Sequence, residues 1–274
     1  MMKLSLNLIT LLLASFLFSC ESEQKNECDE DVDVFGDFYQ SELIEASSEN
    51  EGNVIHNLCS DLSFEAHFAS CAAVTVDTSN GFPITLVVDY GTGCNNERGQ
   101  KKYGKVIFTV YEDMNQEGAY FEITFDDFKI DEASITGKQK FENTGIGTEA
   151  NKEVQVVSNI TSSYPDGATR THDYTRQRTQ ISGFETCDRS DDEYLVTGAG
   201  IVDYGDKKSV RVIREPLHIK STCKYPVAGI IDVESQNLKG EVNYGDGACD
   251  KTATLKVAGF IKKTIDMDQD PCNQ

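Results

Sequence analysis

Few residues in this 274-residue chain could carry out hydrolysis. A serine hydrolase needs a nucleophile, a histidine and an acid within hydrogen-bond reach. The sequence has neither a G-x-S-x-G nucleophile elbow nor the H-E-x-x-H pair of metalloproteases. It contains four histidines, and His172 is the only one followed directly by an acid, Asp173; the others are His56, His67 and His218. Adjacent strand residues point to opposite faces of a sheet, so the side chains of His172 and Asp173 would not meet. We therefore expect His172 at the surface. We also expect no catalytic residue and no enzyme. A hydrolase with an unrecognised site stays open as an alternative.

A short basic segment stands out in an acidic chain. The whole sequence has 46 acidic against 25 basic residues and a formal net charge of −21, and a field of this sign repels nucleic acid. Every second residue of a strand faces the same way, so a strand in this segment would carry on one face Arg170, His172, Tyr174, Arg176 and Arg178. Such a face could bind carboxylates or phosphates. The alternative is that it pairs with the protein's own acids.

A weaker ligand pattern lies near the C-terminus. Asp266, Asp268 and Asp270 alternate like the start of a calcium-binding loop. However, Pro271 stands where the EF-hand requires glycine, and no glutamate closes the twelve-residue frame. The alternative is a solvated tail, and we expect no bound metal or cofactor.

The nine cysteines include two pairs that bound similar stretches. Cys71 opens a stretch that ends in Val-Asp-Tyr-Gly-Thr-Gly at Cys94, and Cys223 opens one that ends in Val-Asn-Tyr-Gly-Asp-Gly-Ala at Cys249. A third partial copy, 202–206, lacks the cysteine. Each copy would end a strand in a glycine turn, and a hairpin would bring its two cysteines together. We therefore predict two disulfides, Cys71 with Cys94 and Cys223 with Cys249. The remaining cysteines, whose pairing the sequence leaves open, are Cys28, Cys59, Cys187 and Cys272.

The elements that must position these residues are strands. From Ala72 onward the apolar residues recur at every second position, as in Val106, Phe108 and Val110. Runs of this kind are separated by glycine, asparagine and aspartate, and no long helical pattern lies between them. The pattern predicts an all-β fold of mainly antiparallel sheet, as a sandwich, an open barrel or an extended curved sheet. The predicted strands are 84–90, 106–111, 121–126, 130–141, 154–160, 169–181, 194–204, 210–219, 227–233, 238–244 and 253–265.

The first twenty residues have the order of an export signal. Lys3 precedes an apolar run from Leu4 to Phe18, which is too short for a comfortable membrane-spanning helix. The end of the run, Leu-Phe-Ser-Cys at Cys20, resembles the lipobox of bacterial lipoproteins, although Phe18 is bulkier than the residue usual there. This resemblance implies acylation of Cys20, and several acyl chains anchor a protein stably.

The chain thus divides into four expected parts. Residues 1–19 form a lipoprotein signal peptide, and the acid-rich stretch 20–37 forms a solvated tether. Residues 38–70 show less regular spacing, which predicts an irregular segment or one or two short helices broken near Gly52 and Asn53. The β-rich domain covers 71–274 and contains the two cysteine-bounded echoes, 71–94 and 223–249.

Several of these features together resemble an uncharacterised family of Bacteroidota cell-envelope lipoproteins. They are the lipobox, the acidic tether, the stretch 71–94, the strand start Gly-Lys-Val-Ile at 104–107 and the segment Thr-Phe-Asp-Asp-Phe at 124–128. The resemblance implies β architecture and an outer-membrane location at the cell surface, with the periplasmic face as the alternative. It carries no catalytic residue over.

We therefore expect a lipid-anchored envelope protein with a non-catalytic role in binding or structure. It would contact the membrane only through its lipid, and its partner would be a glycan, a peptide or another envelope protein. One alternative is the capture of a glycan or nutrient beside an outer-membrane transporter. Sugar-binding faces usually present aromatic rings, tryptophan above all, and the chain has no tryptophan.

Overall fold

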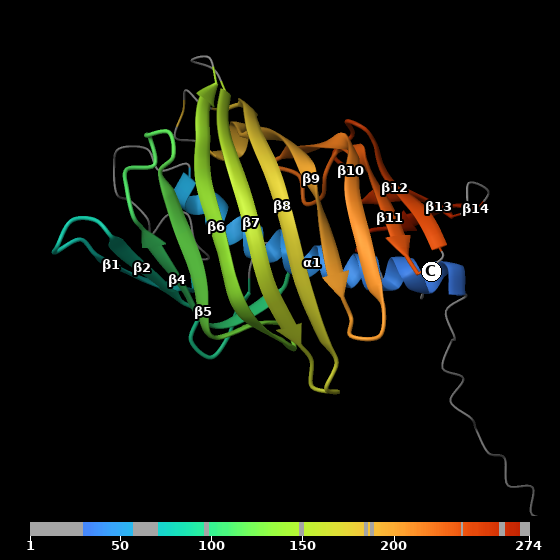
Figure 1. The fold of residues 1–274 in the computed structure, drawn as a ribbon, viewed down its shortest axis with the longest axis horizontal. Helices are drawn as coiled ribbons and strands as arrows, with labels where there is room; N and C mark the ends of the chain where they lie inside the picture. Colours follow the sequence, from blue (N-terminus) through green and yellow to red (C-terminus); the bar gives the residue numbers. More distant parts are fainter. Residues whose placement is uncertain are drawn as a thin grey trace, which may run out of the picture.

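Alternating apolar residues fold the chain into one long antiparallel sheet (Figure 1). The structure is a computed structural model that describes residues 30–56, 71–95, 99–147, 151–183, 186, 189–236, 238–257 and 261–268. The strands are β1 (Ala73–Asp77), β2 (Ile84–Asp89), β3 (Cys94–Asn95), β4 (Lys101–Val110), β5 (Tyr120–Ile130), β6 (Ala133–Gly147), β7 (Asn151–Ser163), β8 (Thr169–Ser182), β9 (Glu193–Asp203), β10 (Lys208–Lys220), β11 (Ala228–Ser235), β12 (Leu238–Asp246), β13 (Thr252–Val257) and β14 (Ile261–Asp266).

The strands follow one another through the sheet almost in sequence order. The path runs β1-β2-β4-β5-β6 and onward to β14, while the short β3 pairs with β4 beside it. The predicted all-β, antiparallel fold is therefore confirmed. The chain forms one curved sheet, so the sandwich is wrong. The predicted run 253–265 is not one strand but the two strands β13 and β14.

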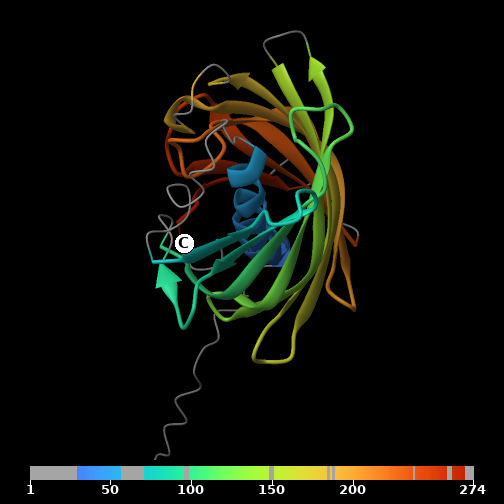
Figure 2. The ribbon, with the colours of Figure 1, turned by 90° about the vertical axis from the view of Figure 1, so that its left-hand side faces the viewer.

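One helix, α1 (Glu30–His56), lies against the concave side of the sheet, which curves around it (Figure 2). Its first residues fall within the predicted tether 20–37, so that part of the prediction is wrong. The predicted break near Gly52 and Asn53 is also wrong, because the helix runs through both residues. A Cβ on Gly52 would lie 2.1 Å from Cζ of Phe141 in β6. This glycine therefore marks a close approach of the helix to the sheet.

Two apolar clusters fill the concave side and leave a polar zone between them. The first gathers the inner faces of β2 and β4 to β7, with Phe108, Phe121 and Phe141 among its buried rings. The second gathers the inner faces of β9 to β14, with Val196 and Leu255 almost fully covered. Buried polar side chains of α1, β8 and β10 contact one another between these clusters. Burial of apolar area stabilises the two halves of the sheet and their contacts with α1, while polar contacts join the helix to the middle of the sheet.

The two predicted disulfides are present. The Cα atoms are 5.7 Å apart in the pair Cys71 and Cys94 and 5.5 Å apart in the pair Cys223 and Cys249. The predictions for the remaining cysteines, Cys28, Cys59, Cys187 and Cys272, lie outside the described side chains.

The repeated Tyr-Gly stretches share one local hydrogen bond. In each copy the glycine backbone N–H donates to the side chain two residues earlier: Gly91 to Asp89 at 2.8 Å, Gly205 to Asp203 at 2.9 Å and Gly245 to Asn243 at 2.8 Å. Local bonds of this type fix a turn without help from the rest of the fold. The prediction of structural turns holds at Gly91 and Gly205, which follow their strands, but is wrong at Gly245, which lies inside β12 at an irregularity of its pairing with β11.

The expected signal peptide and the lipidated residue Cys20 lie outside the described residues. Within the described part of the chain, no helix has both the length and the apolar character needed to cross a bilayer.

Candidate functional site

The predicted basic face exists, and it lies on the concave side of β8. Along the strand His172, Tyr174 and Arg178 are buried, whereas Asp173 and Thr175 between them are exposed. Arg170 donates to the hydroxyl of Tyr164 at 3.2 Å at the start of the strand. The alternation places the side chains of the basic face opposite α1, where they meet the acids of the helix.

Three glutamates of α1 supply the partners of Arg176. Its Nη1 donates to Oε1 of Glu49 at 2.7 Å, its Nη2 donates to Oε2 of Glu45 at 2.6 Å, and Nη2 also lies 3.5 Å from Oε1 of Glu42. Residues 42, 45 and 49 are three and four positions apart, so they share one face of a helix. This part of the basic face therefore pairs with the protein's own acids, which was the alternative interpretation.

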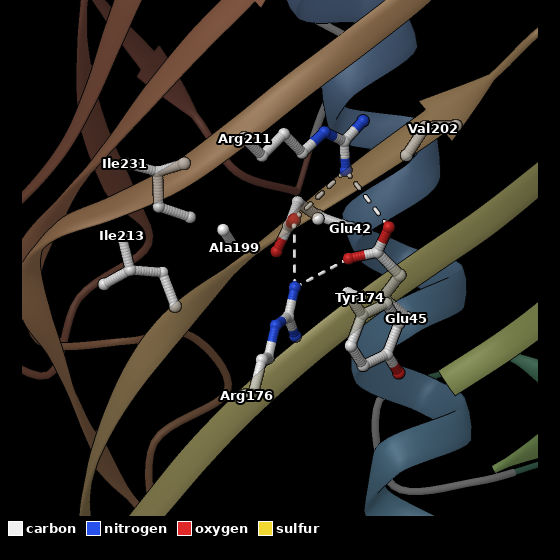
Figure 3. Close-up of a pocket in the computed structure, with 10 residues that line it drawn as sticks. Glu42, Glu45, Tyr174, Arg176, Ala199, Val202, Arg211, Ile213 and Ile231 are labelled. Carbon is white, nitrogen blue, oxygen red and sulfur yellow. Dashed lines mark hydrogen bonds and ion pairs between the residues drawn. The ribbon is translucent and has the colours of Figure 1, made fainter. Parts of the chain in front are cut away.

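A second arginine, Arg211 of β10, contacts two of the same acids (Figure 3). Its Nη1 lies 3.2 Å from Oε1 of Glu42 and 3.3 Å from Oε1 of Glu45, and its Nη2 donates to the hydroxyl of Tyr204 at 3.3 Å. Arg211 is only 5% exposed. Ion pairs this well shielded from water depend strongly on one another, because a charge that loses its partner stays buried.

The two shared glutamates titrate in opposite directions. Burial and the neighbouring Glu45 carboxylate raise the pKa of Glu42 to about 7. Burial also opposes ionisation of Glu45, but Arg211, the hydrogen bond with His172 and Arg176 outweigh it and lower the pKa of Glu45 to about 2. The cluster therefore holds Glu45 as a carboxylate, while Glu42 gains or loses its proton near neutral pH.

His172 is buried, and the expectation of a surface histidine is wrong. Its Nδ1 lies 3.1 Å from Oε1 of Glu45, and its Nε2 lies 3.1 Å from Oγ of Ser162 in β7. Asp173 points away, as the strand geometry predicted, and accepts a hydrogen bond from Asn159. The sequence could not reveal this arrangement because the acid comes from α1, 127 residues away.

Ser162, His172 and Glu45 have the connectivity of a hydrolytic triad. However, Ser162 and His172 are both 0% exposed. Neither of the two lines the pocket beside Glu45, which has room for about one water molecule. This chain of hydrogen bonds links α1 to β7 and β8.

A larger cavity, of about 270 Å³, lies between α1 and the inner face of the sheet. About half of the residues in its wall are apolar or aromatic, and most of the others are charged. The helix contributes Tyr39, Glu42, Leu43, Ala46 and Glu49, and the rest of the chain contributes Gly99, Gln100, Arg176, Arg178, Leu217, Ile219, Lys224, Tyr225, Pro226, Tyr244, Met267 and Asp268.

The exposure of the lining residues shows where the cavity opens. Lys224 and Asp268 are exposed and form an ion pair with each other. Arg178 and Tyr244, by contrast, are 6% and 4% exposed. The cavity therefore runs from a charged, solvent-facing end to a buried end that contains Arg178 of the predicted basic face.

Two of the three candidate calcium residues pair with lysines. Asp266 lies 2.7 Å from Nζ of Lys251, and Asp268 pairs with Lys224. Asp270 lies outside the described residues. In the part of the chain that the structure describes, no group of three or more histidine, cysteine, aspartate or glutamate side chains could hold a metal ion.

Sequence reasoning missed the glutamates of α1, Arg211 and the cavity. The spacing of Glu42, Glu45 and Glu49 was a usable signal, because an acidic helix face beside a basic strand face suggests that the two pair. Arg211 had no such signal, since it sits between Val210 and Val212, and those valines point outward with exposures of 41% and 44%.

Comparisons of the chain with protein-family models, with curated proteins and with solved structures gave no significant match.

Proposed function

We propose that this protein is a non-catalytic binding protein of the cell envelope that holds a small molecule in the cavity between α1 and the sheet. The observation that carries the proposal is the cavity itself, about 270 Å³ in size and next to the helix. This volume is close to the lower limit of about 300 Å³ for typical small-molecule sites. Like those sites, the cavity combines apolar walls with a few fixed polar groups.

The walls suit a compact apolar or aromatic ligand. Leu43 and Ala46 line the helix side, while Leu217, Ile219 and Tyr225 line the sheet side. Each square ångström of apolar ligand surface removed from water contributes roughly 25 cal/mol. In a cavity of this size the capture alternative would hold a small nutrient rather than a long polysaccharide.

The anchoring part of the proposal rests on the sequence. An acylated Cys20 would hold the sheet and helix near a membrane without any spanning segment. This position would suit a protein that takes up or passes on small amphipathic molecules at an envelope surface.

Binding of the neutral fluorescent probe N-phenyl-1-naphthylamine tests the proposed function. We expect saturable, one-to-one fluorescence enhancement with wild-type protein and its loss in A46F, because the phenyl ring would occupy the cavity. The matched control is A168F, which places the same ring on an exposed turn outside the cavity. Equal binding by all three proteins, or no binding by the wild type, would exclude the cavity as the binding site.

Hydrolysis is the second candidate, and the hydrogen-bonded chain of Ser162, His172 and Glu45 is the observation that favours it. A fluorophosphonate probe reacts covalently with an activated serine and so tests it directly. We expect no labelling of folded wild-type protein, because Ser162 is 0% exposed. Labelling that disappears in S162A but persists in S158A would establish a hydrolase instead.

A further inference from the structure

Among the described residues of the cavity wall, the guanidinium of Arg178 is the charged group that lacks an opposite charge. It is 6% exposed, and its guanidinium carbon lies 4.4 Å from the ring centroid of Tyr194. Its Nε is buried without a hydrogen-bond partner. Within the described part of the chain Arg178 forms no ion pair, although it borders a cavity that also contains carboxylates.

The other charges of the cavity are already satisfied. Glu49 accepts from Arg176 at 2.7 Å, and Lys224 pairs with Asp268 at the exposed end. Glu42 is shared by Arg176 and Arg211. These carboxylates contact other cations, and Arg178 is the cation among the described lining residues without a carboxylate partner.

A buried cation without a partner is costly. Desolvation of an ionised group amounts to several kcal/mol even after relaxation of its surroundings, and a buried polar group without a partner is a further cost. The planar guanidinium offers two parallel N–H donors to a carboxylate or a similar anion. A bound anion would therefore offset, in the complex, the desolvation cost that the unpaired charge of Arg178 imposes on the free protein.

We infer that the ligand is an amphiphile whose acidic group binds Arg178 and whose apolar part lies among Leu217, Tyr225 and the helix. This inference rests on the proposed function and adds the charge of the ligand to it. Carboxylate, sulfonate and phosphate groups all fit the same donor geometry. Apolar contacts would supply affinity for any ligand of the right size, and Arg178 would select the anionic ones.

Two probes with the same ring framework separate the charge from the apolar contribution. 1-Anilinonaphthalene-8-sulfonate carries an acidic group, and N-phenyl-1-naphthylamine does not. In R178M, which keeps an unbranched apolar chain and removes the charge, we expect sulfonate affinity to fall about tenfold or more, since hydrogen bonds to charged groups contribute roughly 1.5–3 kcal/mol. Affinity for the neutral probe should change less than twofold. R214M removes an exposed arginine outside the cavity and should change neither.

A stability measurement distinguishes a binding role from a structural one. Because R178M removes an unpaired buried charge, we expect its melting temperature without ligand to equal or exceed that of the wild type. A purely structural arginine would give a lower melting temperature and no selective loss of sulfonate binding. R178K keeps the charge but lacks the two parallel N–H donors of the guanidinium, so it should bind the sulfonate with intermediate affinity.

Competition on the wild type needs no variant. Decanoate should displace the neutral probe at a concentration at least tenfold lower than decanol. One outcome is that the neutral probe binds, that decanoate and decanol compete equally, and that R178M retains sulfonate affinity. In that case the inference of an acidic ligand is wrong, while the proposed function stands. If neither probe binds the wild type, both are wrong.

Discussion

Nη2 of Arg176 in β8 donates to Oε2 of Glu45 in α1 at 2.6 Å, across 131 residues of sequence. The same glutamate contacts Arg211 of β10 and His172 of β8. One carboxylate therefore connects the helix to two strands. Because the most exposed of these four side chains, that of Arg176, is only 11% exposed, the attachment of α1 depends on charges that water cannot readily satisfy when a partner is lost.

Replacement of Glu45 should detach the helix from the sheet. In E45Q, Arg176 and Arg211 keep their charges but lose a shared partner, and removal of one member of a buried ion pair typically costs about 3–5 kcal/mol. Urea unfolding should show a loss of this size. The matched control is E234Q, since Glu234 pairs with Lys239 where the side chains are 52% and 75% exposed. Exposed pairs contribute at most about 1 kcal/mol, so equal losses in the two variants would argue against a buried ion network.

The raised pKa of Glu42 predicts that its replacement stabilises the protein at high pH, in contrast to the loss of stability expected for replacement of Glu45. The folded protein holds this proton up to about pH 7, whereas a glutamate freely exposed to water titrates at 4.5. Stability from this group is therefore fully present below pH 4.5 and is lost as the pH rises through 7. E42Q resembles the protonated form, so we expect it to match the wild type at pH 4.5 and to be more stable at pH 8, by up to about 3 kcal/mol. Urea midpoints at both pH values measure the difference. The raised pKa would be contradicted if E42Q, compared with the wild type, lost stability between pH 4.5 and pH 8.

The two disulfides should contribute separately to stability. Their cysteines are 23 and 26 residues apart, and chain entropy predicts about 3.5 kcal/mol for loops of this length. The double variants C71S/C94S and C223S/C249S should each lose a similar amount in urea unfolding. Because the bridges lie at different ends of the sheet, the losses should add. A loss in one pair that depends on the other would contradict this independence and indicate that the two ends interact.

Much of the sheet could be predicted because its signal is local. Alternation along β8 was enough to place Arg170, His172 and Arg176 on one face from the sequence alone. The repeated turns likewise identified both disulfides, since a hairpin brings its ends together whatever surrounds it. Pattern and turn chemistry agree in these segments, which is why the predictions hold there.

The interior of the fold could not be predicted in the same way. In β10 the polar residues Ser209 and Arg211 point inward while Val210 and Val212 point outward, which reverses the usual rule. For Arg211 the cause is the acidic face of α1, and only the folded structure shows that the helix lies on this side of the sheet. Gly52 was similarly mistaken for a helix break, because its contact with Phe141 is not visible from neighbouring residues.

Lipidation of Cys20 remains a prediction from the sequence. Cells grown with an alkyne-tagged palmitate should incorporate the tag into the wild-type protein and not into C20S. C28S, which removes another cysteine of the N-terminal region, should be labelled like the wild type. Tag in C20S, or loss of the tag in C28S, would place the modification elsewhere.

A crystal structure of the protein with 1-anilinonaphthalene-8-sulfonate tests the central claim most directly. We expect density for the rings between Ala46, Leu217 and Tyr225, with the sulfonate against the guanidinium of Arg178. A probe bound only outside this cavity, or a cavity that stays empty at saturating probe concentration, would contradict the assignment of a ligand site between the helix and the sheet.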